Sequence, residues 1–554
     1  MPSSQARKVA PEKNAAATSS SATSPPRAST PFLDDQNQRL PFTQLITVYL
    51  CLAICDFVSF LDASSITTAL PSIARSLSAQ NSITWAGTSY LIAYAAFQVL
   101  YGRLSDVFGR KPILLWSVAM LIFGDILCGF AQNPIWLYIC RGLSGIGSGG
   151  ISSLVQIIIS DLVSLRERGK YQGAISAAIG LGAATGPFVS AGLLKTGPEG
   201  WRWAFWVPAI LAAACIPFLV FLLPTKPITG SWRDKICKID WLGLGSAVVA
   251  LLFLLIPVNS AGTIWAWDNA IVISLLVVGS LSLVLFLFTE WKIAKLPLMP
   301  LRLFHSPSQA MVLAQSILFG FVWQADLYFL PIYYQEVRQF SPLRSATLIL
   351  PLLIFQSVTG VLSGPLMSRL TRFRPIMCYG FALWFLGAGL KLLFSRTTST
   401  GVYIAALFIE GAGVGFVVQP TLVALQALSK PEDRAVVTST RNLLRATGSA
   451  FGVAVSTAIE YSVMKSSLPS ALPSSLKAQV LDGSWLANST NFPQWTSSIL
   501  DARMRGIHAV FISCVPLMGL CLVGCVFVQD RILMSDANPQ TDKEVVDPTA
   551  KAVV

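Results

Sequence analysis

Long apolar runs recur through almost the whole chain, and short polar loops separate them. About twenty apolar residues are enough for a helix to cross the hydrocarbon core of a bilayer. The pattern therefore predicts an all-α polytopic membrane protein with fourteen transmembrane helices. The expected spans are 44–71, 84–106, 112–130, 134–160, 171–194, 202–223, 240–258, 269–290, 309–334, 345–369, 375–395, 401–427, 435–463 and 506–529.

The composition excludes a soluble protein. Only 12% of the 554 residues are charged and 53% are hydrophobic, whereas about 25% of the residues of a soluble protein are charged. The net charge of +13 could suit nucleic acid, but the bases lie in short loops between apolar runs, as membrane orientation requires. We therefore expect the lipid bilayer as a partner, and no nucleic acid.

Loops rich in basic residues alternate along the chain with loops that are poor in them. This alternation tests the predicted number of spans. Loops on one side are rich in Lys and Arg, and those on the other side are poorer. A wrong number of spans would scramble this alternation, and cytoplasmic loops carry the excess of bases. We therefore expect both termini in the cytoplasm. The basic loops include Arg103, Arg110, Lys111, Arg166, Arg168, Lys170, Lys226, Arg233, Lys235, Lys238, Lys292, Lys295, Arg302, Arg369, Arg372, Arg374, Lys430 and Arg434.

The stretches outside the spans differ in composition. Residues 1–43 are rich in Ser, Ala and Pro and lack an apolar core, which predicts a disordered cytoplasmic tail. Residues 531–554 are expected to form a second cytoplasmic tail. The segment 464–505 falls on the outer side and holds an Asn-Ser-Thr triplet at Asn488, which makes Asn488 a candidate glycosylation site.

Patterns for catalysis or cofactor binding are missing from the sequence. The ten cysteines are scattered, and the two histidines, His305 and His508, stand outside any metal or catalytic motif. No glycine-rich loop ending in Lys-Ser or Lys-Thr is present to hold a nucleotide phosphate. We therefore expect no metal, no cofactor and no enzymatic activity.

The loop between the second and third expected spans is short and strongly charged. Residues 102–112 read Gly-Arg-Leu-Ser-Asp-Val-Phe-Gly-Arg-Lys-Pro. Glycine permits a sharp turn and the close approach of another helix. Asp106 lies at the C-terminal end of a helix, where the helix dipole disfavours a carboxylate. Asp106 is therefore expected to have a partner elsewhere.

This loop resembles motif A of the major facilitator superfamily, G-x-L-a-D-r-x-G-R-K-x-x-L. The resemblance implies the major facilitator fold, with six-helix bundles at 44–223 and 309–530 and two extra helices in a linker at 224–308. In the family the motif latches the two halves, and its acid caps the eleventh helix, here 435–463. The latch residues would be Gly102, Asp106, Gly109, Arg110 and Lys111, with Leu104 and Leu114 also in register and Val107 replacing a frequent base.

Three further stretches are similar to motifs of the superfamily. The residues around Arg141 resemble motif B, which the family associates with proton coupling. Residues 182–192 resemble motif C, the antiporter signature, although Ser190 and Ala191 replace its last two glycines. A proline that bends a helix between small residues can act as a gate. The implied residues are Gly182, Gly186, Pro187 and Gly192 for the gate, and Arg445, Gly448 and Gly452 for a motif of helix eleven.

Carboxyl groups inside the spans are candidates for proton coupling. An ionised carboxylate in hydrocarbon is costly unless it is paired, hydrated or protonated. Asp56 and Asp62 lie six residues apart on the first span, so they cannot share one helix face. The family resemblance favours Asp62 and depth favours Asp56. We expect Asp62 to pair with Arg141 and to release it on protonation. Further candidates are Asp326, Glu410 and Asp125.

Together these motifs resemble the fourteen-span drug:proton antiporters of fungi. The resemblance implies a monomeric plasma-membrane transporter, driven by protons, that exports drugs, toxins or secondary metabolites by alternating access. A vacuolar carrier of basic amino acids and a proton-coupled nutrient symporter remain alternatives, while a receptor or enzyme lacks supporting motifs. Residues suited to a small amphipathic substrate are Trp85, Tyr94, Gln98, Gln156, Gln324, Tyr328, Gln356 and Gln419.

Overall fold

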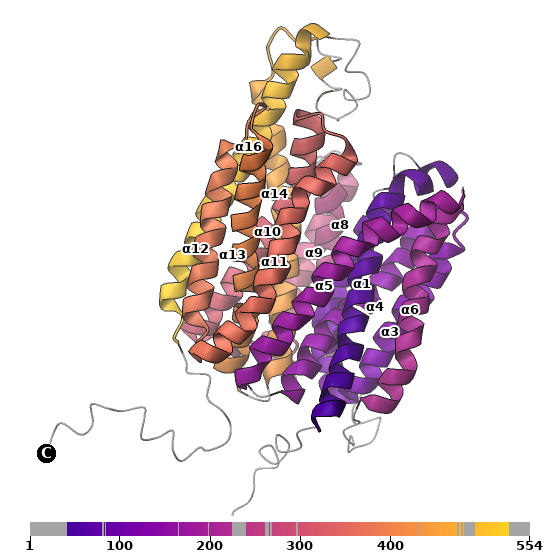
Figure 1. Cartoon of the computed structure of the whole chain (residues 1–554), viewed down its shortest axis with the longest axis vertical. Helices are drawn as coiled ribbons and strands as arrows, with labels where there is room; N and C mark the ends of the chain where they lie inside the picture. Colours follow the sequence, from indigo (N-terminus) through magenta and orange to yellow (C-terminus); the bar gives the residue numbers. More distant parts are fainter. Residues whose placement is uncertain are drawn as a thin grey trace, which may run out of the picture. The chain divides into compact units, whose positions relative to one another are not determined.

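The computed structural model of the chain is entirely helical in its long elements (Figure 1). It describes residues 41–79, 82–83, 85–163, 165–197, 199–223, 240–260, 265, 269–294, 297–430, 433–473, 476–477, 480 and 493–530. The predicted tails at 1–43 and 531–554 therefore lie almost wholly outside the described residues, and Asn488 lies outside them as well.

A long helix lies at each of the fourteen predicted positions. Their bounds are α1 (Phe42–Ser76), α2 (Trp85–Phe108), α3 (Arg110–Gly129), α4 (Pro134–Leu162), α5 (Leu165–Leu193), α6 (Trp203–Leu222), α8 (Trp241–Ser260), α9 (Ala270–Lys292), α10 (Pro307–Ile332), α11 (Pro342–Leu370), α12 (Arg374–Leu390), α13 (Thr400–Leu428), α14 (Arg434–Ser467) and α16 (Pro493–Gly524). The all-α membrane fold is thereby confirmed.

Eleven helices of the described chain are long and apolar enough to cross a membrane. Of the fourteen, α2, α8 and α14 fall outside that set, and only Trp241–Pro257 of α8 forms a shorter apolar helix. Helix α14 buries several polar side chains inside the protein, among them Arg441 and Asn442. These side chains make its sequence less apolar than that of a helix that faces lipid. The number of fourteen spans therefore stays a prediction.

The largest difference from the predicted bounds occurs in α16, which begins at Pro493 rather than near residue 506. The added turns bury Ile499 and Leu500 against Met464 and Leu468 at the end of α14. Burial of these apolar side chains stabilises a helical extension that the span length alone does not require.

The helices pack as two bundles with matching contacts. In the N-terminal bundle α1 packs on α5, α2 on α4, and α3 on α4 and α6. In the C-terminal bundle α10 packs on α14, α11 on α13, and α12 on α13 and α16. The two bundles have separate cores, one around Leu52 and Leu154 and the other around Phe381 and Trp384. This shared pattern supports the predicted repeat of six helices, although the exact domain boundaries stay predictions.

Helices α8 and α9 pack against each other, and α8 also contacts α2 and α14. Ala96 of α2, Leu251 of α8, Phe286 of α9 and Leu443 of α14 belong to one buried apolar cluster. The two extra helices therefore lie along one of the seams where the bundles meet. The other seam is formed by α5 and α11, which run side by side in Figure 1.

Candidate functional site

Three buried charged side chains meet in the N-terminal bundle. Arg141 on α4 donates from Nη1 to both carboxylate oxygens of Asp62 on α1, at 2.8 and 2.9 Å. The same Nη1 lies 3.7 Å from Oδ1 of Asp125 on α3. All three side chains are fully buried. The structure thus contains the Asp62–Arg141 pair that the sequence predicts, and it adds Asp125 as a second carboxylate.

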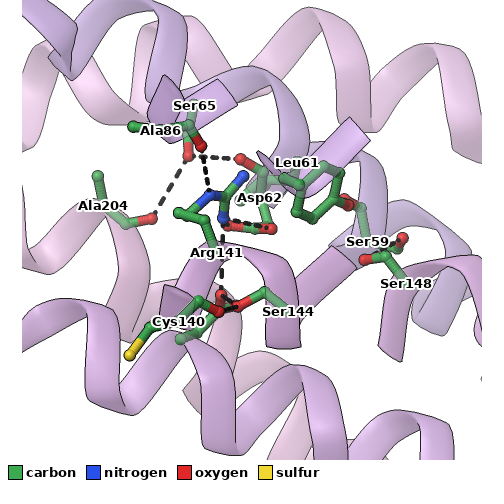
Figure 2. A network of polar contacts seen from close by, with 12 residues as sticks. Ser59, Leu61, Asp62, Ser65, Ala86, Cys140, Arg141, Ser144, Ser148 and Ala204 are labelled. Carbon is green, nitrogen blue, oxygen red and sulfur yellow. Dashed lines mark hydrogen bonds and ion pairs between the residues drawn. The ribbon is translucent and has the colours of Figure 1, made fainter. Parts of the chain in front are cut away.

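Arg141 is held from several directions (Figure 2). Its Nε donates to the carbonyl of Ala86 at 3.2 Å, and its guanidinium lies 4.3 Å from the centre of the Tyr90 ring, whose face attracts a cation. Ser144 donates to Asp125 at 2.6 Å. Among the described residues, Nη2 of Arg141 and Oδ2 of Asp125 are buried without a hydrogen-bond partner. The cluster therefore retains unused capacity to bind a proton or a water molecule.

A second buried charge cluster lies in the C-terminal bundle. Lys391, in the 3-10 turn Lys391–Leu393 after α12, donates to Asp326 on α10 and, at 2.8 Å, to Glu410 on α13. Trp384 on α12 donates to the same Oε1 of Glu410 at 3.0 Å. These three ionisable side chains are at most 1% exposed. The predicted candidates Asp326 and Glu410 are thus brought together by a lysine.

The two clusters occupy equivalent places in their bundles. Each draws one side chain from the first, third and fourth helices, which are α1, α3 and α4 in one bundle and α10, the end of α12 and α13 in the other. The cation comes from the fourth helix as Arg141 but follows the third helix as Lys391. Each cluster combines two carboxyl groups with one cation, so one carboxyl in each is left without a full counter-charge.

Asp56 lies elsewhere on α1 and has its own environment. Ser152 on α4 donates to Oδ1 of Asp56 at 3.1 Å. The other carboxylate oxygen is buried with no hydrogen-bond partner among the described residues. Asp56 and Asp62 therefore bind different side chains of α4, in agreement with the prediction that they do not share one face. Both remain candidates for proton coupling.

A cavity of about 210 Å³ lies between the two bundles. Its walls come from α1 and α2, from α10 and α14, and from α8. Tyr94, Gln98 and Gln324, which the sequence singles out for a substrate site, line it together with Arg445. Tyr90 lines it as well, so the aromatic ring that covers the Arg141 guanidinium joins the cavity to the N-terminal charge cluster. The other predicted pocket residues, Trp85, Gln156, Tyr328, Gln356 and Gln419, lie outside its lining.

The charged loop after α2 is held by ion pairs within the N-terminal bundle. Arg110 donates to Asp106 at 2.5 Å and to Asp161, at the end of α4, at 3.0 Å. Arg103 lies 3.7 Å from Asp106. The residue before α14 is Asp433, and the described residues show no hydrogen bond from α14 to Asp106. The expected cap of α14 by Asp106 is therefore not formed here, because the neighbouring arginines neutralise this carboxylate.

The other residues of this loop have clear structural roles. A Cβ at Gly102 would lie 2.2 Å from Oγ of Ser439 on α14, so this glycine lets the two bundles touch. Gly109, with φ of 94°, precedes α3 in a conformation that side chains disfavour. Lys111 donates to the carbonyl of Val220 at 2.6 Å. The loop thus joins α2 and α3 to α6 and contacts α14 through Gly102.

The glycines predicted for the gate lie mainly against α1. A Cβ at Gly182 would be 2.4 Å from the carbonyl oxygen of Phe57, and one at Gly186 would be 2.7 Å from that of Leu61. Helix α5 continues through Pro187 to Leu193. Gly192, in contrast, has no neighbouring atom within 4 Å of the position that a Cβ would occupy. The first two glycines therefore allow close packing inside the N-terminal bundle, next to Asp62.

The predicted motif of α14 forms a similar contact with α10. A Cβ at Gly448 would lie 2.0 Å from the carbonyl oxygen of Ile317, and one at Gly452 would lie 2.4 Å from that of Phe321. These glycines hold α14 close to α10, which places Arg445 at the wall of the cavity between the bundles.

Two features of the site were missed by the sequence analysis. Lys391 lies near the end of an apolar run, where a lysine normally extends to the membrane surface. The second is the contact of α5 with α11, where a Cβ at Gly173 would lie 2.7 Å from the oxygen of Gly360 and one at Gly364 would lie 2.1 Å from that of Gly169. Glycines spaced four apart on both helices were a signal for this contact.

Comparison with known proteins agrees with this architecture. The sequence profile described as Major Facilitator Superfamily matches residues 52–453. Citrate exporter 1 of Yarrowia lipolytica is 40% identical over 521 residues, which cover 94% of this chain and 77% of that protein. Efflux pump FUS6 of Gibberella moniliformis is 27% identical over 519 residues, 91% of each chain.

Solved structures share the fold at low sequence identity. The human organic anion transporter MFSD10 is 16% identical, with a TM-score of 0.56 over 87% of this chain and 99% of that one. The proton:xylose symporter XylE is 15% identical, with a TM-score of 0.53 over 89% and 98% of the two chains. With its paired bundles, its loop at 102–112 and the profile match over most of its length, the chain belongs to the Major Facilitator Superfamily of membrane transporters.

Proposed function

We propose that this transporter exports small organic molecules in exchange for protons by alternating access. The observation that supports this proposal most is the pair of equivalent buried clusters, Asp62–Asp125–Arg141 and Lys391–Asp326–Glu410. Each has a carboxyl group in excess of its cation. A buried carboxyl without a full counter-charge favours proton uptake, so each cluster can gain and lose a proton as its access to water changes.

The cavity between the bundles is the proposed substrate site. It adjoins the N-terminal cluster through Tyr90 and the C-terminal bundle through Trp323 and Gln324, which precede Asp326 on α10. Midplane sites between two helical repeats suit transport by rocking of one bundle against the other. Protonation of a cluster can thereby influence how the walls of the cavity are arranged.

The contacts between α5 and α11 and between α2 and α14 are the proposed closed side of the transporter. Gly173 brings α5 against the backbone of α11, and Gly102 brings α2 against Ser439 of α14. Two hydrogen bonds also join the bundles, from Gln419 to Ser176 and, at 3.3 Å, from Asn442 to Gln156. Because the loop at 102–112 is basic, we assign this side to the cytoplasm, so the structure corresponds to a state closed toward the cytoplasm.

The direction of transport is proposed from the names of the relatives. Citrate exporter 1 and efflux pump FUS6 are both named for outward transport. One proton crossing 100 mV supplies about 2.3 kcal/mol, and a tenfold ratio costs about 1.4 kcal/mol. One inward proton therefore sustains roughly a fiftyfold gradient of an uncharged substrate.

Reconstitution tests the proposal. The full-length protein is placed in liposomes, and transport of candidate organic acids and hydrophobic drugs is measured with and without an imposed pH difference. We expect accumulation against a gradient that collapses with a protonophore. Transport that is indifferent to an imposed pH difference and to voltage contradicts proton coupling.

Two alternative functions differ from this proposal in the membrane that holds the protein or in the direction of transport. A vacuolar carrier of basic amino acids predicts arginine uptake by isolated vacuoles that depends on this protein. A nutrient symporter predicts lower accumulation in intact cells when the protein is removed, whereas an exporter predicts higher accumulation. Both measurements use the natural chain.

A further inference from the structure

Of the described residues that line the cavity between the bundles, one is formally charged, Arg445 on α14. Among the described residues that line the cavity there is no aspartate or glutamate. The Nε atom of Arg445 is buried and has no hydrogen-bond partner in the described part of the chain. Arg445 as a whole is only partly buried, but an unpartnered buried donor such as this Nε costs free energy, which an acceptor on a bound ligand would offset.

A second arginine on the same helix increases this positive charge. Arg441 lies four residues before Arg445, so the two share one helix face. It is 3% exposed, and its Nη2 donates to the carbonyl of Val418 at 2.8 Å and to Oγ1 of Thr421 at 3.0 Å. Neutral oxygens, and no carboxylate among the described residues, therefore solvate Arg441. An anion bound in the cavity would stabilise both arginines.

Gln98 offers a second point of attachment. It is fully buried, lines the cavity and has an Oε1 without a hydrogen-bond partner among the described residues. Its Nε2 lies 3.4 Å from the hydroxyl of Tyr94. A buried amide with an unpaired atom is costly. A ligand with a hydroxyl or a second, protonated acid group can donate a hydrogen bond to the Oε1 of Gln98. Its carboxylate can bind Arg445 at the same time.

The size of the cavity favours a small ligand. Its volume is about 210 Å³, below the roughly 300–1,000 Å³ that is typical of sites for drug-sized molecules. Aromatic walls from Tyr90 and Trp323 could attract a hydrophobic cation, but the guanidinium in the same wall repels one. Charge and volume therefore both select a small anion.

We propose that the cargo is a small organic acid, whose carboxylate binds the guanidinium of Arg445 and whose second polar group binds Gln98. Arginine presents a planar pair of donors that fits a carboxylate in a bidentate manner. This assignment rests on the proposed function, because it names the substrate class of the same transport site. It assigns Arg445 to substrate binding in addition to helix packing.

Equilibrium binding to the purified full-length protein tests the assignment without requiring transport. The probes are succinate, malate and citrate, compared with the hydrophobic cation tetraphenylphosphonium. We expect the wild type to bind at least one of the acids. Arg445→Gln should weaken that binding about 10- to 100-fold, since a charge-assisted hydrogen bond is lost. Gln98→Leu should weaken it less.

Two variants control for charge and for folding. Arg505→Gln makes the same change at an exposed arginine outside the cavity and should leave acid binding unchanged. Arg445→Lys keeps the charge but loses the bidentate geometry, so we expect an intermediate affinity. If Arg445→Gln fails to give a monodisperse protein, the affinity of Arg445→Lys decides the question.

The outcomes separate this inference from proton coupling. Equal acid affinity in the wild type and in the Arg445 variants overturns the assignment, and so does a wild type that binds only tetraphenylphosphonium. Asp62→Asn should keep acid binding while losing proton-driven accumulation. If acids bind but their transport ignores the proton gradient, the substrate class stands and the proposed coupling fails.

Discussion

Arg141 and Lys391 are the residues on which the two buried charge clusters depend, since each faces two carboxyl groups. Removal of one partner from a buried ion pair leaves an uncompensated charge and costs about 3–5 kcal/mol, whereas removal of both can be nearly neutral. Single and double variants therefore distinguish a contribution to stability from a contribution to coupling.

We expect Asp62→Asn to destabilise the protein by about 3–5 kcal/mol, because Arg141 keeps only the more distant Asp125. The double variant Asp62→Asn/Arg141→Gln should recover most of this stability and still fail in proton-driven transport. Thermal unfolding in detergent and accumulation in liposomes measure the two effects. A double variant that retains full coupling would show that this pair does not bind the transported proton.

In the C-terminal cluster, Lys391→Met should destabilise strongly because Asp326 and Glu410 are left without their cation. The double variant Lys391→Met/Asp326→Asn should be more stable than Lys391→Met alone. Trp384→Phe keeps an aromatic ring but removes the donor to Glu410, at a smaller cost of about 1–3 kcal/mol. Thermal unfolding in detergent ranks these variants. Additive effects of the two substitutions in the double variant would contradict direct pairing of Lys391 with Asp326.

At the scale of elements, the contact of α5 with α11 is the seam that has to open if the protein works by the proposed alternating access. Glycines at this seam bring backbones together without intervening side chains. A larger side chain at this seam should therefore change the equilibrium between the closed and open states. It should leave the packing inside each bundle unchanged. Packed interfaces switch between discrete arrangements, which makes this balance measurable.

Gly173→Leu tests the seam because its side chain has to displace the backbone of α11, 2.7 Å from the glycine's Cβ position. Overpacking costs about 1–3 kcal/mol, which shifts a two-state equilibrium roughly 5- to 150-fold. We expect a lower population of the closed state, measured by single-molecule fluorescence between dyes encoded at Lys170 and Arg369. These two exposed positions lie on α5 and α11.

The matched control is Gly245→Leu on α8, where no atom lies within 4 Å of the Cβ position. It introduces the same side chain without a clash and should leave the distance distribution unchanged. A distribution that is the same for Gly173→Leu and the wild type would exclude this seam as the moving contact.

At the scale of the whole molecule, the parity of the spans determines the topology. Fourteen crossings place both termini on one side, whereas the eleven strongly apolar helices alone would place them on opposite sides. Helices α2 and α14 fall outside this strongly apolar set, and they contact each other where the two bundles meet. A helix surrounded by protein does not need an apolar surface.

We expect reporters fused to the two termini to lie on the same side of the membrane. Protease protection of tags in sealed vesicles measures this directly, and a tag in the loop between α3 and α4 serves as the control for the opposite side. If the protease digests one terminal tag and the membrane protects the other, fourteen crossings are excluded.

Local pattern determined the positions of the helices and the charged loop, because the length of an apolar run and the placement of glycine and arginine act within one segment. The pairing of Asp62 with Arg141 also followed from the sequence, through the family resemblance and from the high cost of an unpaired charge in hydrocarbon.

Only the tertiary structure decided which side chains share a cluster and where the bundles touch. Lys391, Asp326 and Glu410 come from three helices, and Asp106 binds Arg110 instead of capping α14. Arg445 also lines a cavity that is walled by both bundles. The physical reason is that helix periodicity is local, whereas the direction in which each helix faces depends on close packing against other helices of the chain.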